Sequence, residues 1–246
     1  MKIEISNQLF IEVPERLVKI YNAFEPLTTN YIKKYLRPGD TFLDVGANIG
    51  YFSTLASQLV GEAGHIFAVE ASPEVIPMLH ENTATLGNVS ILNFAVGNRR
   101  GTTDFFMTED YVNSGVSMTP FAQNTRKINV PIETLDHWYF ELEPQSRRVD
   151  FIKCDVQGDE VAVLSGAKEM IESSKDLKMV IEWAPAWMRA AGYDPESFPE
   201  FIASLGFKKI VILDDWLQRV MTVSEMRSEF SRDTSTKRFC NIFALK

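Results

Sequence analysis

Two acidic residues end apolar segments in the first third of the chain, and a glycine-containing turn follows the first of them. Asp44 lies near the carboxyl end of Thr41–Val45, an apolar run that predicts a strand buried on both faces. Gly46 and Gly50 follow at the spacing Asp-x-Gly-x-x-x-Gly, and glycines there favour a tight turn whose backbone approaches a ligand closely. Because a carboxylate replaces the first glycine of the dinucleotide fingerprint, this turn disfavours a phosphate and favours a positively charged group.

The second acid, Glu70, follows the apolar segment His65–Val69. It lies 70 − 50 = 20 residues after Gly50, the offset at which nucleotide-binding α/β folds place a carboxylate on ribose hydroxyls. Asp44 and Glu70 together fit a ligand that carries a ribose and a positive charge but no phosphate. S-Adenosylmethionine has these parts, and its ammonium group would bind Asp44. The alternative is that both acids are ordinary strand ends facing solvent, which the glycine spacing makes the weaker interpretation.

Three segments, taken in order, resemble the signature blocks of the FkbM-type methyltransferases: Asp44–Phe52, Asn93–Gly97 and Ile152–Glu160. The resemblance extends from Leu36 to the C-terminus. It implies an S-adenosylmethionine-dependent enzyme with the class I methyltransferase fold, acting on hydroxyl groups of sugars, polyketides or other natural products. One position departs from the family, which usually reads Asp-Val-Glu-Gly in the third block, whereas this chain has Gln157. Any role that requires a carboxylate at that position is therefore in doubt for this chain.

The three blocks and the strand ends together define the residues expected to bind the cofactor. They are Asp44, Gly46, Ala47, Asn48, Gly50, Tyr51, Phe52, Glu70, Ala71, Ser72, Asn93, Ala95, Val96, Asp155 and Gln157.

From Thr41 onward, strand-like apolar segments alternate with helical ones, which predicts a doubly wound, mostly parallel sheet. With the resemblance, this indicates an α/β protein of the class I methyltransferase (Rossmann-like) fold, with a seven-stranded, mostly parallel sheet and helices on both faces. Residues 1–35 are expected to form a short N-terminal extension, a hairpin and helix, ahead of a methyltransferase domain at 36–246. The predicted strands cover residues 41–45, 65–70, 89–93, 149–154, 178–183, 207–213 and 238–245.

Two stretches interrupt this alternation. Residues 99–135 lack a helical period and contain short alternating runs around a polar loop, and residues 214–237 separate the last two predicted strands. Long irregular segments in compact domains are often lids over active sites. Both stretches are therefore expected to cover the carboxyl ends of the sheet.

Methyl transfer to a hydroxyl requires a group that orients the acceptor and receives its proton. Asp155, at the end of a predicted central strand, is the first candidate for this catalytic role, and Glu182, at the end of the neighbouring strand, is the second. Water remains an alternative proton acceptor. His137 is a further candidate, although its segment favours a packed or surface histidine. Capping of the next helix is an alternative role for Asp155.

A metal site is not expected from the sequence. Asp155, Asp159 and Glu160 could suggest a divalent ion, but no histidine or asparagine stands at ligand spacing beside them, and hard cations need several oxygens at once.

Composition narrows the class of protein further. A length of 246 residues suits one sizeable α/β domain, and a formal net charge of −8 argues against nucleic acid as a partner. Cys154 and Cys240 both lie in apolar segments, which favours buried free thiols over a disulfide or a metal site. No apolar stretch is long enough for a signal peptide or a membrane span, so a cytoplasmic location is expected. The oligomeric state is left open.

The function that these features favour is O-methylation of a small-molecule or glycosylated acceptor, with S-adenosylmethionine as the cofactor. A nicotinamide-dependent oxidoreductase is an alternative, disfavoured because the Gly-x-Gly-x-x-Gly fingerprint is absent. A methyltransferase-like module that binds the cofactor without turnover is a second alternative, which Gln157 keeps open.

Overall fold

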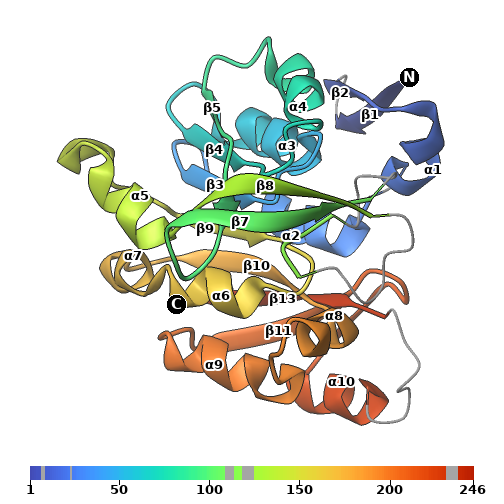
Figure 1. The fold of residues 1–246 in the computed structure, drawn as a ribbon, viewed down its shortest axis with the longest axis vertical. Helices are drawn as coiled ribbons and strands as arrows, with labels where there is room; N and C mark the ends of the chain where they lie inside the picture. The colour runs from blue at the N-terminus through green and yellow to red at the C-terminus, as the bar shows by residue number, and fades with distance from the viewer. Residues whose placement is uncertain (7–8, 23, 109–113, 118–124, 231–237) are drawn as a thin grey trace.

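The computed structural model describes residues 1–246 except 7–8, 23, 109–113, 118–124 and 231–237. Its centre is an eight-stranded sheet with the strand order β12-β11-β13-β10-β9-β3-β4-β5 (Figure 1). The strands are β3 (Thr41–Val45), β4 (His65–Val69), β5 (Val89–Leu92), β9 (Phe151–Cys154), β10 (Lys178–Trp183), β11 (Lys209–Asp214), β12 (Arg219–Met221) and β13 (Cys240–Leu245).

The seven predicted strands are all present in this sheet, with ends that differ from the predicted ones by at most two residues. From β5 to β10 neighbouring strands run parallel, and β13 is antiparallel to both β10 and β11. The eighth strand, β12, pairs antiparallel with β11 and lies in the stretch 214–237. It was not predicted because three residues are too few to show an alternating pattern.

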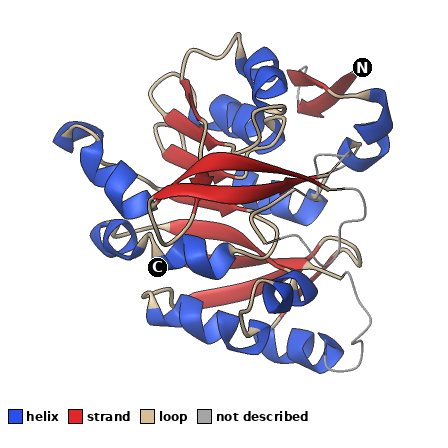
Figure 2. Cartoon of the chain, in the orientation of Figure 1, coloured by secondary structure: helices blue, strands red, loops and turns tan. Residues whose placement is uncertain are grey.

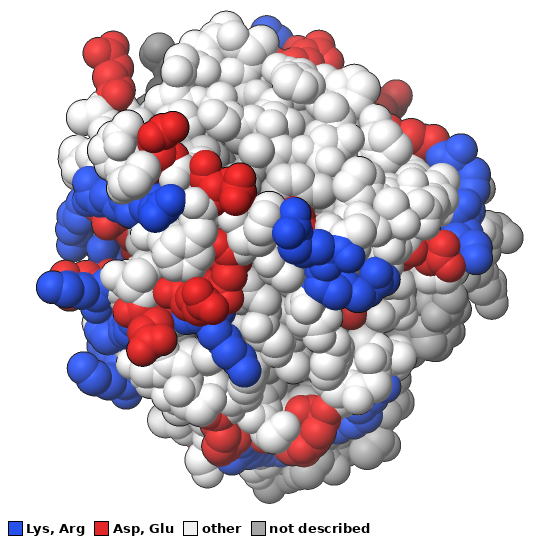
Figure 3. Space-filling model, turned by 60° about the vertical axis from the view of Figure 1, so that its left-hand side comes forward, with Lys and Arg blue, Asp and Glu red and all other residues white. Residues whose placement is uncertain are grey.

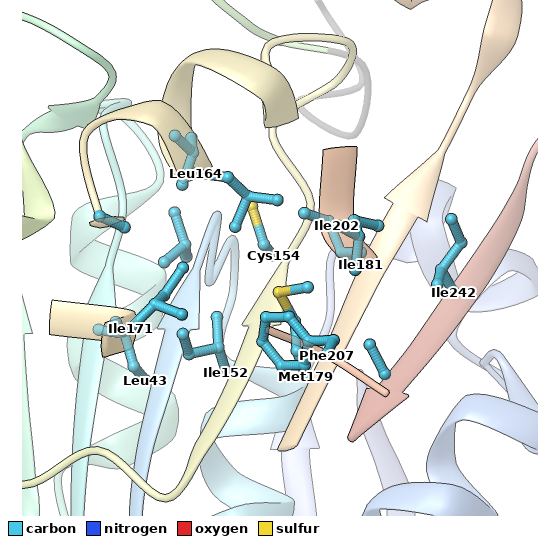
Figure 4. Close-up of a cluster of buried hydrophobic side chains, with 14 of the residues drawn as sticks. Leu43, Ile152, Cys154, Leu164, Ile171, Met179, Ile181, Ile202, Phe207 and Ile242 are labelled. Carbon is cyan, nitrogen blue, oxygen red and sulfur yellow. The ribbon is translucent and has the colours of Figure 1, made fainter. Parts of the chain in front are cut away.

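Helices cover both faces of the sheet, as Figure 2 shows by colour. On one face, α2 (Pro26–Tyr35) and α3 (Tyr51–Val60) share a core with Phe42 of β3. On the other face, the helices from α5 onward share a core with Leu43 of β3 (Figure 4). Successive strand residues thus point to opposite faces, as the pleat requires. The remaining helices are α1 (Val18–Tyr21), α4 (Ile76–Thr83), α5 (Leu135–Glu141), α6 (Glu160–Ser165), α7 (Lys168–Ser173), α8 (Pro185–Ala190), α9 (Phe198–Ser204) and α10 (Val223–Phe230).

The N-terminal segment contains two paired strands followed by α1 and α2. Strands β1 (Lys2–Ser6) and β2 (Leu9–Glu12) pair antiparallel, and Ile11 and Leu17 are buried in the same core as α3. The backbone of Glu12 is also hydrogen-bonded to the Asn82 side chain on α4 in both directions. The extension is therefore packed onto the sheet's helical layer instead of standing apart from it.

The stretch 99–135 is a β-hairpin in its described part. Strands β7 (Gly101–Met107) and β8 (Arg126–Glu133) pair antiparallel, and β6 (Ala95–Val96) adds to β8 to complete a three-stranded sheet. Phe105 and Ile132 lie in its small apolar core, which explains the alternating runs seen in the sequence. The polar loop expected at residues 113–117 lies partly outside the described residues.

Two further expectations concern the molecule as a whole. Cys154 and Cys240 are buried and free, as predicted. Within the described part of the chain, no helix combines the length and apolar character needed to cross a membrane. Figure 3 shows that basic and acidic side chains are interspersed on the face it presents.

Candidate active site

A cavity of about 580 Å³ opens where β3, β4, β9 and β10 end, a volume typical of small-molecule sites. This is the position at which open α/β sheets bind their ligands. The sequence predicted many of the residues that line it: Gly46, Ala47, Asn48, Tyr51, Phe52, Glu70, Ala71, Ala95, Val96, Asp155, Gln157 and Glu182.

Four predicted cofactor residues, Asp44, Gly50, Ser72 and Asn93, lie behind this lining in the described structure. Asp44 is buried and accepts a 2.6 Å hydrogen bond from the Ser53 hydroxyl on α3. Burial raises the pKa of Asp44 to about 6, and the Ser53 bond opposes this rise. The expectation that Asp44 meets the cofactor's ammonium directly is therefore not supported, because its carboxylate faces α3.

The two glycines after β3 serve the packing of the chain. A Cβ atom on Gly46 would lie 1.9 Å from the backbone oxygen of Asp155, and one on Gly50 would lie 2.7 Å from Leu79 Cδ1. Both residues also have left-handed backbone conformations, with φ of +81° and +89°. The space beside these glycines is occupied by the residue that follows β9 and by α4, while Gly46 also lines the cavity, so its approach to the cofactor stays a prediction.

Glu70 stands at the cavity with a fixed carboxylate. Its Oε2 accepts a hydrogen bond from the Asn48 backbone N–H at 2.9 Å, and its Oε1 accepts one from the Ser72 backbone N–H at 2.7 Å. The Asn93 amide donates to the backbone oxygen of Glu70, so Ser72 and Asn93 support Glu70. Burial raises the pKa of Glu70 to about 7 despite these backbone hydrogen bonds. Each oxygen keeps a second lone pair, so the carboxylate can accept from a ligand hydroxyl.

A buried lysine that the sequence prediction missed lies at the centre of the site. Lys153 is 2% exposed, and its Nζ lies 3.2 Å from Asp155 Oδ2 and 5.2 Å from the centre of the Phe52 ring. Burial alone would lower its pKa, but the neighbouring carboxylates, Asp155 foremost, raise it above the ordinary value. The sequence did carry a signal, because a lysine inside the apolar strand Phe151–Cys154 requires buried counter-charges.

Strand parity explains why these charges meet. Asp44 and Lys153 are direct partners across β3 and β9. Glu182 lies two residues after Val180, the partner of Lys153 on β10, so it points to the same face. This face is covered by the N-terminal segment, from which Glu25 reaches Asn241 of β13 with a 3.0 Å hydrogen bond. Burial raises the pKa of Glu25 to about 7.

The two predicted catalytic acids lie in one cluster. Asp155 accepts hydrogen bonds from Lys153 and from Gln157 Nε2, the latter at 2.7 Å. Oxygens of Asp155, Glu160 and Glu182 lie within 4.8 Å of one another. Burial, and next the nearby carboxylates, raise the pKa of Glu182 well above its ordinary value. Burial also raises the pKa of Glu160 to about 8.

Aromatic side chains from distant segments form the outer walls of the cavity. Tyr21 and Phe24 come from the N-terminal extension, and the Tyr21 hydroxyl donates to Asn48 Oδ1 at 3.2 Å. In the C-terminal part of the chain, the rings of Trp187 and Phe239, which also line the cavity, stack with their centres 6.3 Å apart. Trp216, in the stretch predicted to cover the sheet, also lines the cavity and is 69% exposed.

Residues 99–135, the other stretch predicted to cover the sheet, also line the cavity, through Phe105 of β7 and residues 114–116. The Ser117 hydroxyl then donates to Asp159 Oδ1 at 2.9 Å. His137, by contrast, does not line the cavity. It lies on α5 with Nδ1 3.1 Å from Glu133 and Nε2 3.7 Å from Glu141, so the structure gives no support to its role as a base.

Comparisons with known proteins agree with this architecture. A model of the methyltransferase FkbM domain matches residues 44–209, more than half of the chain. The 2-O-methyltransferase NoeI of Sinorhizobium fredii is 27% identical over 153 residues, which cover 56% of this chain and 62% of NoeI. A protein-L-isoaspartate O-methyltransferase of Aeropyrum pernix is 39% identical over 61 residues, 25% of this chain and 24% of that enzyme. The chain thus spans less than two thirds of the length of either relative.

Among solved structures, a precorrin-6y C5,15-methyltransferase from Geobacter metallireducens has a TM-score of 0.50 at 14% identity, covering 96% of this chain and 95% of its own. This likeness confirms the predicted class I methyltransferase fold. The family match, residues 44–209, includes all three segments that resemble the signature blocks, Asp44–Phe52, Asn93–Gly97 and Ile152–Glu160. The chain therefore belongs to the FkbM family of methyltransferases, whose methyl donor is S-adenosylmethionine.

Proposed function

We propose that this protein is an O-methyltransferase that acts on a hydroxyl group of a sugar, a polyketide or another natural product. The observation that carries the proposal is that one cavity holds Glu70 together with the two acids Asp155 and Glu182. A carboxylate suited to a ribose and carboxylates suited to an acceptor hydroxyl thus share one space. The name of NoeI, a 2-O-methyltransferase, supports oxygen as the methylated atom.

At the cofactor end, Glu70 is proposed to accept hydrogen bonds from the ribose hydroxyls. Its backbone partners hold both carboxylate oxygens before any ligand binds, which lowers the entropic cost of binding. The small residues Ala95 and Val96 leave room for a flat base beside Glu70. The cavity of about 580 Å³ is large enough for an adenosine with its amino-acid arm.

At the acceptor end, S-adenosylmethionine supplies a methyl group on a positively charged sulfur. The acceptor oxygen forms the new O–C bond, the S–C bond breaks, and the hydroxyl proton must leave. Asp155 is proposed to orient the hydroxyl and to receive this proton, while Lys153 and Gln157 hold the Asp155 carboxylate in position. Glu182 is the competing acid, and water the alternative acceptor of the proton.

Calorimetry tests the cofactor half of the proposal. S-Adenosylhomocysteine is expected to bind the full-length protein with a dissociation constant in the micromolar range, about −7 to −9 kcal/mol. Glu70→Ala should weaken this binding by about 1.5–3 kcal/mol, because hydrogen bonds to the ribose are lost. Tight binding of NADH with no binding of S-adenosylhomocysteine would instead establish the oxidoreductase alternative.

Transfer of a radiolabelled methyl group tests the reaction. The protein is incubated with labelled S-adenosylmethionine and a panel of free sugars, glycosides and polyketide alcohols, and the labelled product is treated with mild base. An ether-linked methyl group survives this treatment, whereas a methyl ester is released. Cofactor binding without transfer to any hydroxyl of the panel would favour a module that does not turn over.

A further inference from the structure

We propose that Asp155, Glu160 and Glu182, with the amide oxygen of Gln157, form a binding site for one hard divalent cation of the calcium or magnesium class. The role of this site in catalysis rests on the proposed function, because the site lies where the acceptor hydroxyl is expected. The sequence analysis considered a divalent ion at Asp155, Asp159 and Glu160 and did not favour it. In the structure Glu182, from a different strand, belongs to the cluster, and Asp159 does not.

The spacing of the acids fits an ion. Their oxygens lie within 4.8 Å of one another. Two oxygens on opposite sides of a calcium ion, each at about 2.3–2.6 Å, lie about 4.6–5.2 Å apart, and those around magnesium lie closer. The three side chains therefore surround a cation of this class with little or no movement.

Two unpartnered atoms provide an independent indication of a ligand. Among the described residues, Glu182 Oε2 and Gln157 Oε1 are buried and have no hydrogen-bond partner. Glu182 is 2% exposed and Gln157 is 8% exposed, and both line the cavity. A buried oxygen without a donor is costly, and a cation supplies what both oxygens lack.

Gln157 is placed to join the acids. Its Nε2 donates to Asp155 Oδ1 at 2.7 Å, which places the amide group beside the cluster. Its carbonyl oxygen, the unpartnered atom described above, is therefore available to bind the same cation. Gln157 lies in a tight turn, since it and Gly158 both have positive φ, +61° and +105°.

The charge balance of the site points the same way. Lys153 is the cation at the centre of the cluster, and its ion pair is with Asp155 alone. Glu160 accepts only backbone N–H bonds, from Val156 and Gly158, and these carry no full charge. Glu160 and Glu182 thus have no basic side chain as an ion-pair partner among the described residues, and a divalent ion that displaces their protons would supply the missing positive charge.

The ion would also fit methyl transfer. Four protein oxygens leave coordination positions open, since these cations take six or more ligands. An acceptor hydroxyl bound at an open position becomes more acidic, and its oxygen is fixed for attack on the methyl carbon.

Calorimetry on the full-length protein, stripped with a chelator, tests the site without any need for turnover. Calcium and magnesium chlorides are titrated separately, and one site per chain is expected, with a dissociation constant on the order of 10⁻⁵–10⁻³ M for the better ion. Glu182→Gln should weaken binding at least about tenfold. Asp159→Asn is the matched control: it removes an acid that lines the same cavity but lies outside the cluster, and should change the affinity by less than about threefold.

A second variant guards against loss of folding in the first. Gln157→Glu adds a fourth acid at the same length and should tighten cation binding by about tenfold. Absence of saturable binding for either ion up to about 10 mM, or equal affinity in the parent and Gln157→Glu, would overturn the proposal. The assigned methyl donor is tested separately by S-adenosylhomocysteine in the chelated protein, so failure of the cation site and failure of the proposed function are distinguishable.

Discussion

Of the two glycines after β3, Gly46 is the one at which an added Cβ atom would come closer to another atom. Substitution by alanine adds one methyl group, which would lie 1.9 Å from the backbone oxygen of Asp155 and 3.0 Å from its carbonyl carbon. Asp155 directly follows the central strand β9 and its backbone N–H is bonded to the Val45 oxygen, so its backbone cannot yield as a flexible side chain does. The φ of +81° adds a second penalty, because a Cβ atom disfavours left-handed backbone conformations.

The two penalties can be separated with a control glycine. Gly39 has the same φ of +81°, but a Cβ atom there would meet nothing within 4 Å. Gly39→Ala should therefore lower the free energy of unfolding by about 1–2 kcal/mol, the conformational cost alone. Gly46→Ala should lower it by that amount plus about 1–3 kcal/mol for the forced separation of β3 and β9.

Urea denaturation of the parent and both variants measures these differences, and activity provides a second readout. Because the strain falls on Asp155, Gly46→Ala should reduce the turnover number more than it reduces affinity for S-adenosylhomocysteine, whereas Gly39→Ala should change neither. Equal destabilisation by the two substitutions would show that β9 yields freely at this contact. The account of Gly46 as a packing position would then be wrong.

Further predictions concern the buried charges. Because the pKa of Glu70 rises from 4.5 to about 7 on folding, its proton favours the folded state, and this contribution is lost as pH increases from 4.5 to 7. The free energy of unfolding should fall by up to about 3 kcal/mol through this effect. Urea titrations at pH 5 and pH 8 measure the fall, and Glu70→Gln should abolish it. If the parent and the variant lost the same free energy between the two pH values, the assigned pKa shift would be contradicted. Asp155→Asn should lower the turnover number by a factor of about 10²–10⁴ and leave the cofactor affinity nearly unchanged. Glu182→Gln should lower the turnover number less. If Asp155→Asn kept a tenth of the activity, Asp155 would not be the base. Lys153→Met should lower the free energy of unfolding at pH 7 by about 3–5 kcal/mol, because it leaves buried carboxylates unpaired. A decrease below about 1 kcal/mol would mean that those acids are protonated in the parent protein.

The strands and the place of the site could be predicted because each rests on a short local pattern. Thr41–Val45 is apolar and ends before a glycine, and the structure gives the same bounds. The carboxyl ends of β3, β4, β9 and β10 then bring Glu70, Asp155 and Glu182 to one cavity, as the general rule for parallel sheets requires.

The direction of individual side chains was harder to predict. Asp44 shares its strand face with Phe42, which packs against α3, so parity could have shown that it faces Ser53. Lys153 likewise follows Phe151 on that face. The contribution of Glu25 had no local signal at all, because it depends on how the N-terminal segment folds back over the sheet.

The walls of the cavity extend beyond the part of the chain that defines the family. The matched segment, residues 44–209, includes the glycine turn after β3 and the acid cluster, but the cavity-lining residues Tyr21, Glu25, Trp216 and Phe239 all lie outside it. We therefore expect these flanking segments, together with the matched domain, to shape the surface that meets the acceptor. Transplanting residues 15–25 and 214–239 between relatives, with the shared centre left intact, is accordingly the direct route to exchanging acceptor preference.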